Sequence, residues 1–150
     1  MIPNFGSMNS TAAAENDLLK AESISDFLGG NHEYMLDLTL SEYLMLLLQQ
    51  KELKRADVVR DSGLEKAYVY QIFSGEKKPT RDKLTAIAFG LHLNSKETQR
   101  MLKLGGHSEL YARQTRDAII LFAIHRGMDI WKTDELLADN SFSTILDSGK

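Results

Sequence analysis

The side chains best suited to bind a polyanion lie between Arg55 and Arg81. Lysine and arginine donate to phosphate oxygens, and glutamine can donate and accept at once in a paired contact with a base edge. Their spacing separates them into two groups. The candidates for contact with base edges are Lys66, Ala67, Tyr70 and Gln71. The candidates for contact with phosphates are Arg55, Lys77, Lys78 and Arg81.

Most of these side chains belong to two predicted short helices, residues 55–62 and 65–74, joined at Gly63. Glycine accepts the left-handed backbone that a tight turn requires. Apolar residues occupy the positions that must face each other when two short helices cross at a steep angle. They are Val58, Val59, Leu64, Val69 and Ile72. Ser62 is small enough to permit close approach at the turn.

Once this inner face is assigned, the second helix is left with a polar outer face. An α-helix fits the major groove of DNA, and its N-terminal residues reach base edges. Lys66 can donate to guanine, and Gln71 can pair with adenine. Ala67 or the ring of Tyr70 can touch a thymine methyl group. Arg55 begins the first helix, where free backbone N–H groups and a cation suit a phosphate. We therefore expect double-stranded DNA as the partner.

Basic residues also follow the second helix and dominate the middle of the chain. Lys77, Lys78 and Arg81 flank the next turn, where they can hold neighbouring phosphates. Residues 51–103 hold twelve Lys or Arg and seven acidic residues, whereas residues 1–50 hold one Lys and seven acidic residues. The net charge of −3 argues against a polyanion partner, but the distribution favours one. A solvated helix surface carrying both signs is the alternative interpretation.

The stretch from Leu40 to Leu93 resembles the Cro and lambda-repressor-like (XRE) helix-turn-helix regulators. The shared features are the corner with Gly63 and Leu64, the apolar Val69 and Ile72, the stretch SGEKKPTRDKL and the closing AIAFGLHL. The resemblance implies a five-helix bundle, DNA recognition by residues 65–74 and transcription regulation, usually as a dimer. The stretch LYARQTRDAIILFAIHRG resembles the segment after this domain in a bacterial subgroup.

Three positions depart from the pattern of the family. Arg55 stands where the family usually has glutamine, and a cation there still favours contact with the DNA backbone. Phe73 replaces a common glutamate and is expected to join the core. Glu65 opens the recognition helix, where it either caps the helix dipole or accepts from a cytosine amino group.

Helical periodicity extends over most of the remaining chain, and no stretch alternates as a strand would. We expect disorder over residues 1–16, a helix and linker over 17–38, the DNA-binding domain over 39–94, and a packed helical extension over 95–146. Thr39 and Glu42 predict a capping box. The other predicted helices span residues 17–28, 80 or 81 to 91, 95–104, 113–126 and 130–140. The predicted fold is all-α, a five-helix lambda-repressor-like helix-turn-helix bundle with a helical C-terminal extension.

The sequence has no pattern typical of a catalytic or metal site. It contains no cysteine, its histidines lack metal-ligand spacing, and its serines lack a nucleophile elbow. Gly29-Gly30 and Gly105-Gly106 lack the residues of a phosphate loop and read as helix stops. The apolar run Leu44–Leu48 is shorter than the roughly 20 residues of a membrane span. We expect a cytoplasmic protein without enzyme activity, metal, cofactor or membrane contact.

Two functions remain open. The first is a sequence-specific transcription regulator that places residues 65–74 in the major groove. The second is a protein-interaction adaptor or anti-repressor that keeps the fold without strong DNA binding, which the acidic N-terminal third and Glu65 favour. Tyr68 and Tyr70 either stack on bases or pack against the bundle.

The apolar residues of the C-terminal extension have two alternative roles. They either complete the core or form an interface with a second copy or a protein partner, for which Trp131 is the candidate anchor. These residues are Ile119, Ile120, Phe122, Trp131, Leu136 and Leu137.

Overall fold

The structure is a computed structural model that describes residues 11–25, 27 and 37–147. Over these residues it contains eight α-helices and no strand, so the predicted all-α class is confirmed. The chain divides into two compact units, Met1–Leu38 and Thr39–Lys150. The second unit begins at Thr39, the residue at which the DNA-binding domain is predicted to begin. None of the described helices is both long enough and apolar enough to cross a membrane.

Among the described residues of the N-terminal unit, α2 spans Thr11–Lys20. Residues 11–16 of the stretch expected to be disordered lie in α2. The physical reason is a run of three alanines, the strongest helix formers, just before the apolar residues of this helix. The predicted helix over 17–28 begins earlier and is interrupted by a bend at residues 22 and 23. Residues 1–10 and the predicted stop at Gly29-Gly30 lie outside the described residues.

Over residues 39–147, the C-terminal unit contains seven helices. They are α4 (Leu40–Lys51), α5 (Arg55–Ser62), α6 (Lys66–Ser74), α7 (Arg81–Gly90), α8 (Ser95–Leu104), α9 (Thr115–His125) and α10 (Ile130–Asp139). The bounds of α5 to α10 lie within two residues of the predicted ones. α4 begins with the predicted capping box, because Thr39 Oγ1 accepts from the N–H of Glu42 at 3.1 Å and Glu42 accepts from the N–H of Thr39 at 3.0 Å.

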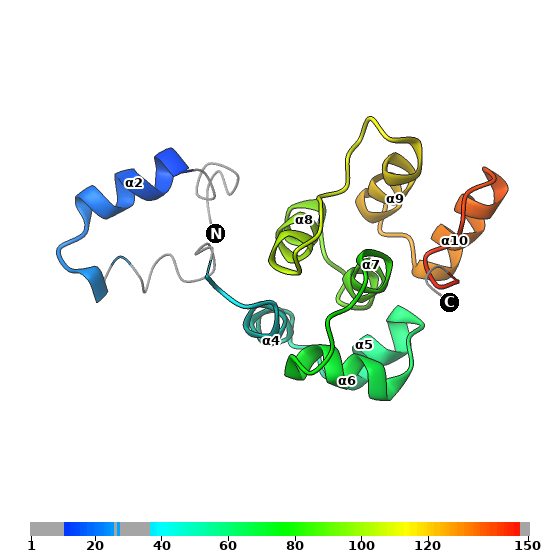
Figure 1. Ribbon diagram of the computed structural model, residues 1–150, viewed down its shortest axis with the longest axis horizontal. Helices are drawn as coiled ribbons and strands as arrows, with labels where there is room; N and C mark the ends of the chain where they lie inside the picture. The colour runs from blue at the N-terminus through cyan, green and yellow to red at the C-terminus, as the bar shows by residue number, and fades with distance from the viewer. Residues whose placement is uncertain (1–10, 26, 28–36, 148–150) are drawn as a thin grey trace. The chain divides into compact units, whose positions relative to one another are not determined.

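Helix α7 is the central helix of this unit, with the other six around it (Figure 1). Its residues 84–90 and the following Leu91 are all buried, and it packs against α5, α8 and α10. Gly90 lets α5 approach closely, since a Cβ built there would lie 2.8 Å from the carbonyl oxygen of Val58. This crossing places α5, and with it α6, on one side of the core.

Helices α9 and α10 pack on each other and reach the core through α8 and α7. Ile120 and Leu137 are fully buried, so these predicted residues complete the core. Phe122 and Trp131 remain 47% and 50% exposed. The extension therefore belongs to the same compact unit as α4–α8, and it leaves two large side chains partly in solvent.

Candidate nucleic-acid interface

Helices α5 and α6 meet at a tight turn and form the α5–α6 corner, residues 55–74. Val58, Val69 and Ile72 are at most 1% exposed. Burial of one aliphatic side chain contributes about 1.5–3 kcal/mol, so these three residues hold the corner closed. Leu64 is buried and Val59 is half-buried. The predicted inner face is therefore confirmed, and Phe73 joins the core as expected.

The turn itself is fixed by Ser62 and Gly63. Gly63 has a φ of +74°, the left-handed backbone that its position predicts. Ser62 is fully buried, and its Oγ accepts a hydrogen bond from the N–H of Leu64 at 3.2 Å. Because this bond spans the turn, it fixes the direction in which α6 leaves the corner.

A segment distant in sequence, around Leu146, covers the turn. A Cβ built on Gly63 would lie 2.9 Å from Cδ1 of Leu146 and 3.5 Å from Cζ2 of Trp131. Asp134 holds this segment in place, since its carboxylate accepts from the N–H groups of Ile145 at 2.6 Å and Leu146 at 3.1 Å. Burial raises the pKa of Asp134. No local pattern in the sequence links residue 146 to residue 63, so this contact could not be predicted.

The predicted base-contacting residues lie on the outer face of α6. Lys66 and Ala67 are exposed, and Tyr70 and Gln71 are half-buried. None of the four is enclosed in the bundle. Lys66 and Gln71 therefore lie on the side of α6 that faces away from the core, as the helical spacing predicts.

Arg55, Lys66 and Tyr70 form one cluster across the corner. The guanidinium carbon of Arg55 lies 4.6 Å from the ring centroid of Tyr70, and Nζ of Lys66 lies 5.6 Å from it. Cations within about 6 Å of an aromatic face are attracted by the ring. Arg55 and Lys66 are the first residues of α5 and α6. Each N-terminus, which already carries a partial positive charge, thus presents an exposed cation.

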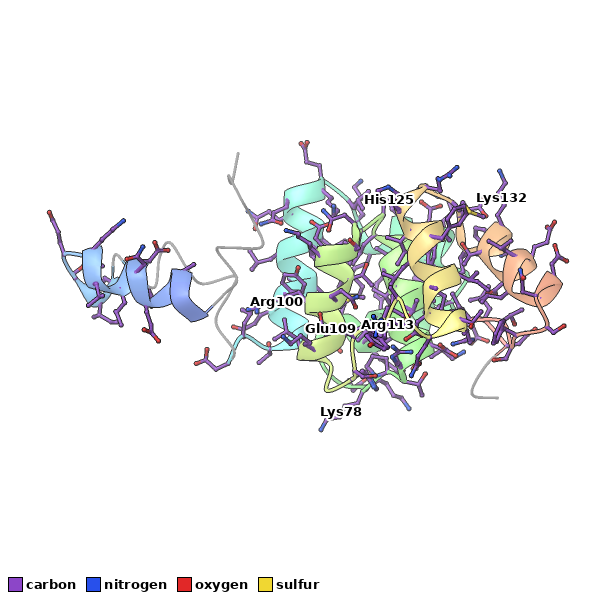
Figure 2. All side chains as sticks on the ribbon, turned by 90° about the horizontal axis from the view of Figure 1, so that it is seen from above. Lys78, Arg100, Glu109, Arg113, His125 and Lys132 are labelled. Atoms are coloured by element: carbon purple, nitrogen blue, oxygen red, sulfur yellow. The ribbon has the colours of Figure 1, made fainter. Side chains whose placement is uncertain are left out.

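The loop between α6 and α7 carries the next pair of cations. Lys77 and Lys78 are exposed, and Lys78 projects from the body of the unit in Figure 2. The loop backbone is tied at both ends. The N–H of Lys77 donates to the carbonyl oxygen of Gln71 at 3.1 Å, and Nε2 of His107 lies 2.9 Å from the carbonyl oxygen of Pro79. The two lysines therefore extend from an anchored loop.

Arg81, the fourth predicted phosphate contact, is differently placed. Its guanidinium donates two hydrogen bonds to Asp117, at 3.0 and 2.9 Å. It donates two more to the backbone carbonyl oxygens of Ser108 at 3.0 Å and Glu109 at 2.7 Å. Four of the five N–H groups of a guanidinium are thus used inside the unit. A phosphate role for Arg81 remains a prediction, and the geometry argues against it.

A second arginine–aspartate pair joins the same two helices, with the arginine on α9 and the aspartate on α7. Arg116, on α9, donates to both carboxylate oxygens of Asp82, on α7, at 3.0 and 3.1 Å. Its Nε donates to the carbonyl oxygen of Ser143 at 3.1 Å. The tripeptide Thr-Arg-Asp occurs at residues 80–82 and again at 115–117, but this repeat alone does not say that the two segments lie side by side.

Tyr68 lies beside the outer face of α6 and is half-buried. Nζ of Lys83 lies 6.0 Å from its ring centroid. Burial raises the pKa of its hydroxyl. These contacts favour the packing alternative for Tyr68 over stacking on a base.

The charge on this side of the molecule has an excess of cations. Six basic and four acidic residues lie between Lys54 and Lys78. Two of the acidic residues, Asp57 and Asp61, bond to Arg60 at 3.2 and 2.9 Å. The remaining acidic residues are Glu65 and Glu76, both exposed. The remaining basic residues are Lys54, Arg55, Lys66, Lys77 and Lys78, all exposed.

Across the described ranges, no cluster of three or more His, Cys, Asp or Glu side chains is suited to hold a metal ion.

The chain matches no known family model, and no solved structure matches it. It is 41% identical over 78 residues to the protein translocase subunit SecA of Trichodesmium erythraeum (strain IMS101). The match covers 51% of this chain and 8% of that relative. The chain therefore spans a small fraction of the relative's length.

Proposed function

We propose that this protein binds double-stranded DNA as a sequence-specific transcription regulator, with α6 as the recognition helix. In this proposal α4–α8 form a lambda-repressor-like five-helix domain. The observation that carries it is the cluster of Arg55 and Lys66 around the ring of Tyr70. Two helix N-termini place exposed cations on one face, beside the side chains suited to read bases.

The proposed complex assigns separate tasks to the two groups of side chains. α6 lies in the major groove, where Lys66, Ala67, Tyr70 and Gln71 face base edges. Phosphates are contacted by Arg55 at the start of α5 and by Lys77 and Lys78 on the next loop. Arg81 is left out of the phosphate contacts, because Asp117 and two carbonyl oxygens already occupy its guanidinium.

The first test is direct binding to DNA. A random pool of duplexes is enriched on the full chain, and the affinity for the enriched duplex is measured by fluorescence anisotropy at several salt concentrations. Each phosphate contact contributes about −0.9 to the slope of log affinity against log salt. Three contacts per subunit predict a slope of about −3. Failure to enrich any sequence, together with a slope near zero, would refute the proposal.

A homodimer fits this proposal. Two recognition helices about 34 Å apart would reach successive major grooves on one side of the duplex. The exposed Phe122 and Trp131 on α9 and α10 provide apolar surface for such an interface. Sedimentation on a duplex with two half-sites tests it, since a dimer predicts two subunits per duplex.

A protein-interaction adaptor is the second candidate. It is favoured by the exposed Glu65 at the start of α6, where a carboxylate would repel phosphates, and by the half-exposed Trp131. Retention of a specific protein partner by a chain that shows no salt-dependent DNA binding would select this function. Neither function requires a cofactor or a catalytic group, and both would operate in the cytoplasm.

A further inference from the structure

One end of the C-terminal unit contains an open cavity of about 560 Å³. It lies where α4 begins, where α6 and α8 end, and beside the loop that carries Lys77 and Lys78. Sites for small molecules typically have about 300–1,000 Å³ and a mostly apolar wall with few polar groups. The cavity therefore has the size of a small-molecule site.

The wall of the cavity combines apolar and basic groups. Leu40, Ile72 and Leu104 supply aliphatic surface, and Lys77 and Lys78 are the basic residues of the lining. Its described lining contains no acidic residue. A ligand that complements this wall needs an apolar body and a negative charge.

The other side-chain donors of the lining are already used. The hydroxyl of Thr39 donates to the carboxylate of Glu42 at 2.9 Å, and the hydroxyl of Ser41 donates to the carbonyl oxygen of Phe73. The ammonium groups of Lys77 and Lys78 are therefore the charged donors that would meet an anionic ligand.

We propose that this cavity binds a small apolar carboxylate, a molecule with an aliphatic or aromatic body and one carboxylate group. The body lies against Leu40, Ile72 and Leu104, and the carboxylate binds Lys77 and Lys78. This inference goes beyond DNA binding, although the same two lysines are proposed phosphate contacts. A bound carboxylate and a DNA phosphate would then compete for the same charges.

The test uses the full chain without DNA. Three probes separate the contribution of the apolar body from that of the carboxylate. Decanoate has both the apolar body and the carboxylate, acetate has only the carboxylate, and decyltrimethylammonium has the apolar body with the opposite charge. Binding is followed by the backbone amide resonances of glycines in two-dimensional NMR spectra. Gly75, Gly105 and Gly106 line the cavity, whereas Gly127 does not, so it serves as the internal control.

We expect decanoate to shift the resonances of the three cavity glycines in a saturable manner and to leave Gly127 unchanged. Acetate and decyltrimethylammonium are expected to bind at least tenfold more weakly. No saturable shift with decanoate, or shifts of equal affinity with all three probes, would overturn the proposal.

Variants test whether decanoate binds in this cavity or on another apolar surface. Lys77→Gln with Lys78→Gln is expected to weaken decanoate binding at least tenfold, because both lysines are exposed and their loss leaves the core intact. Lys96→Gln, on the exposed surface of α8, is the matched control and should bind decanoate like the natural protein. Leu104→Trp fills the cavity and should abolish binding, with folding checked by the thermal midpoint. Unchanged decanoate affinity in the double lysine variant would also contradict the proposal.

Discussion

The guanidinium of Arg81 forms a two-pronged contact with the carboxylate of Asp117, with N–O distances of 3.0 and 2.9 Å. The neighbouring residue on each helix forms the reciprocal pair, in which Arg116 contacts Asp82. The first turns of α7 and α9 are thus joined by two crossed ion pairs. Because α7 directly follows the basic loop, these pairs also fix the end of the loop that carries Lys77 and Lys78.

Loss of one partner from the Arg81–Asp117 pair should destabilise the fold. The Asp117 side chain is only 5% exposed, and Asp117→Ala would leave a guanidinium with an unbalanced charge in a partly buried position. Removal of one partner from a buried pair costs about 3 kcal/mol. The free energy of unfolding, measured with urea, should fall by about this amount for Asp117→Ala.

Arg60→Ala is the matched control. Arg60 contacts Asp57 and Asp61, but its side chain is 66% exposed, so its loss should cost much less stability than the loss of Asp117. The double variant Arg81→Met with Asp117→Leu should lose less stability than Asp117→Ala, since no charge remains unpaired. Equal losses of unfolding free energy for Asp117→Ala and Arg60→Ala would show that the buried ion pair contributes no more to stability than the exposed one.

The pH dependence of stability should reveal two carboxylates with opposite pKa shifts. Burial would raise the pKa of Asp117, but hydrogen bonds from Arg81 and the N–H of Tyr111 outweigh it and lower the pKa below its ordinary value of 3.8. Burial dominates at Asp134 and raises its pKa above 3.8. Asp117 therefore contributes stability that is lost as the pH falls through its folded pKa. Asp134 contributes stability that is lost as the pH rises through its folded pKa.

Asp117→Asn and Asp134→Asn test these signs. The free energy of unfolding is measured for each variant from about pH 7 to about pH 3. The deficit of Asp117→Asn relative to the natural protein should shrink as the pH falls below 3.8. The deficit of Asp134→Asn should grow as the pH falls from its raised pKa to 3.8. Parallel curves for both variants would contradict the assigned shifts.

Gly90→Ala should destabilise the protein although alanine is the better helix former. Helix propensity alone predicts a gain of about 1 kcal/mol. The added Cβ would lie 2.8 Å from the carbonyl oxygen of Val58 and 2.9 Å from the Cβ of Ser62. Overpacking of this kind typically costs about 1–3 kcal/mol. The urea midpoint should therefore fall, and a rise would show that α5 and α7 can separate freely.

Gly127→Ala provides the comparison for this variant. Its φ is +67°, and a Cβ there would meet nothing within 4 Å. The Gly127→Ala variant should lose stability only because alanine disfavours the left-handed backbone. We expect this variant to leave the proposed DNA affinity unchanged. Gly90→Ala should weaken DNA binding as well, because it displaces the helix on which the α5–α6 corner rests.

Two surface variants should separate the proposed tasks of α6 and the basic loop. Lys77→Ala should weaken binding to all duplexes alike and reduce the salt slope by about 1. Gln71→Ala should cost about 1–3 kcal/mol on the preferred duplex and much less on random DNA. Lys96→Ala, on the exposed surface of α8, is the control. Equal effects of Gln71→Ala on preferred and random duplexes would remove its assignment as a base contact.

Local patterns in the sequence were sufficient to predict the elements of the C-terminal unit. The inner face of the α5–α6 corner follows from helical spacing around Gly63, and the cap of α4 follows from Thr39 and Glu42 three residues apart. Both depend on residues close in sequence. The start of α2 was missed because its first residues, alanines and small polar groups, show helix propensity without an apolar stripe.

Contacts between distant residues were beyond prediction. Arg81 stands close to two lysines and was assigned to phosphate, since a single sequence does not say that Asp117 lies within reach. The position of Leu146 over Gly63 likewise depends on the packing of α10. Exposure of Lys66 could be predicted from the helix face, but its position near the ring of Tyr70 required the arrangement of both helices.

The cover over Gly63 makes the proposed recognition helix, α6, depend on a segment that is synthesised much later. During translation the α5–α6 corner leaves the ribosome long before Leu146 does, so its turn stays uncovered until that segment has emerged. Cleavage by a protease just before Ile145 would spare every proposed DNA contact and still open the turn. A tag fused after Asp147 would likewise be attached directly to the segment that covers the turn at Gly63.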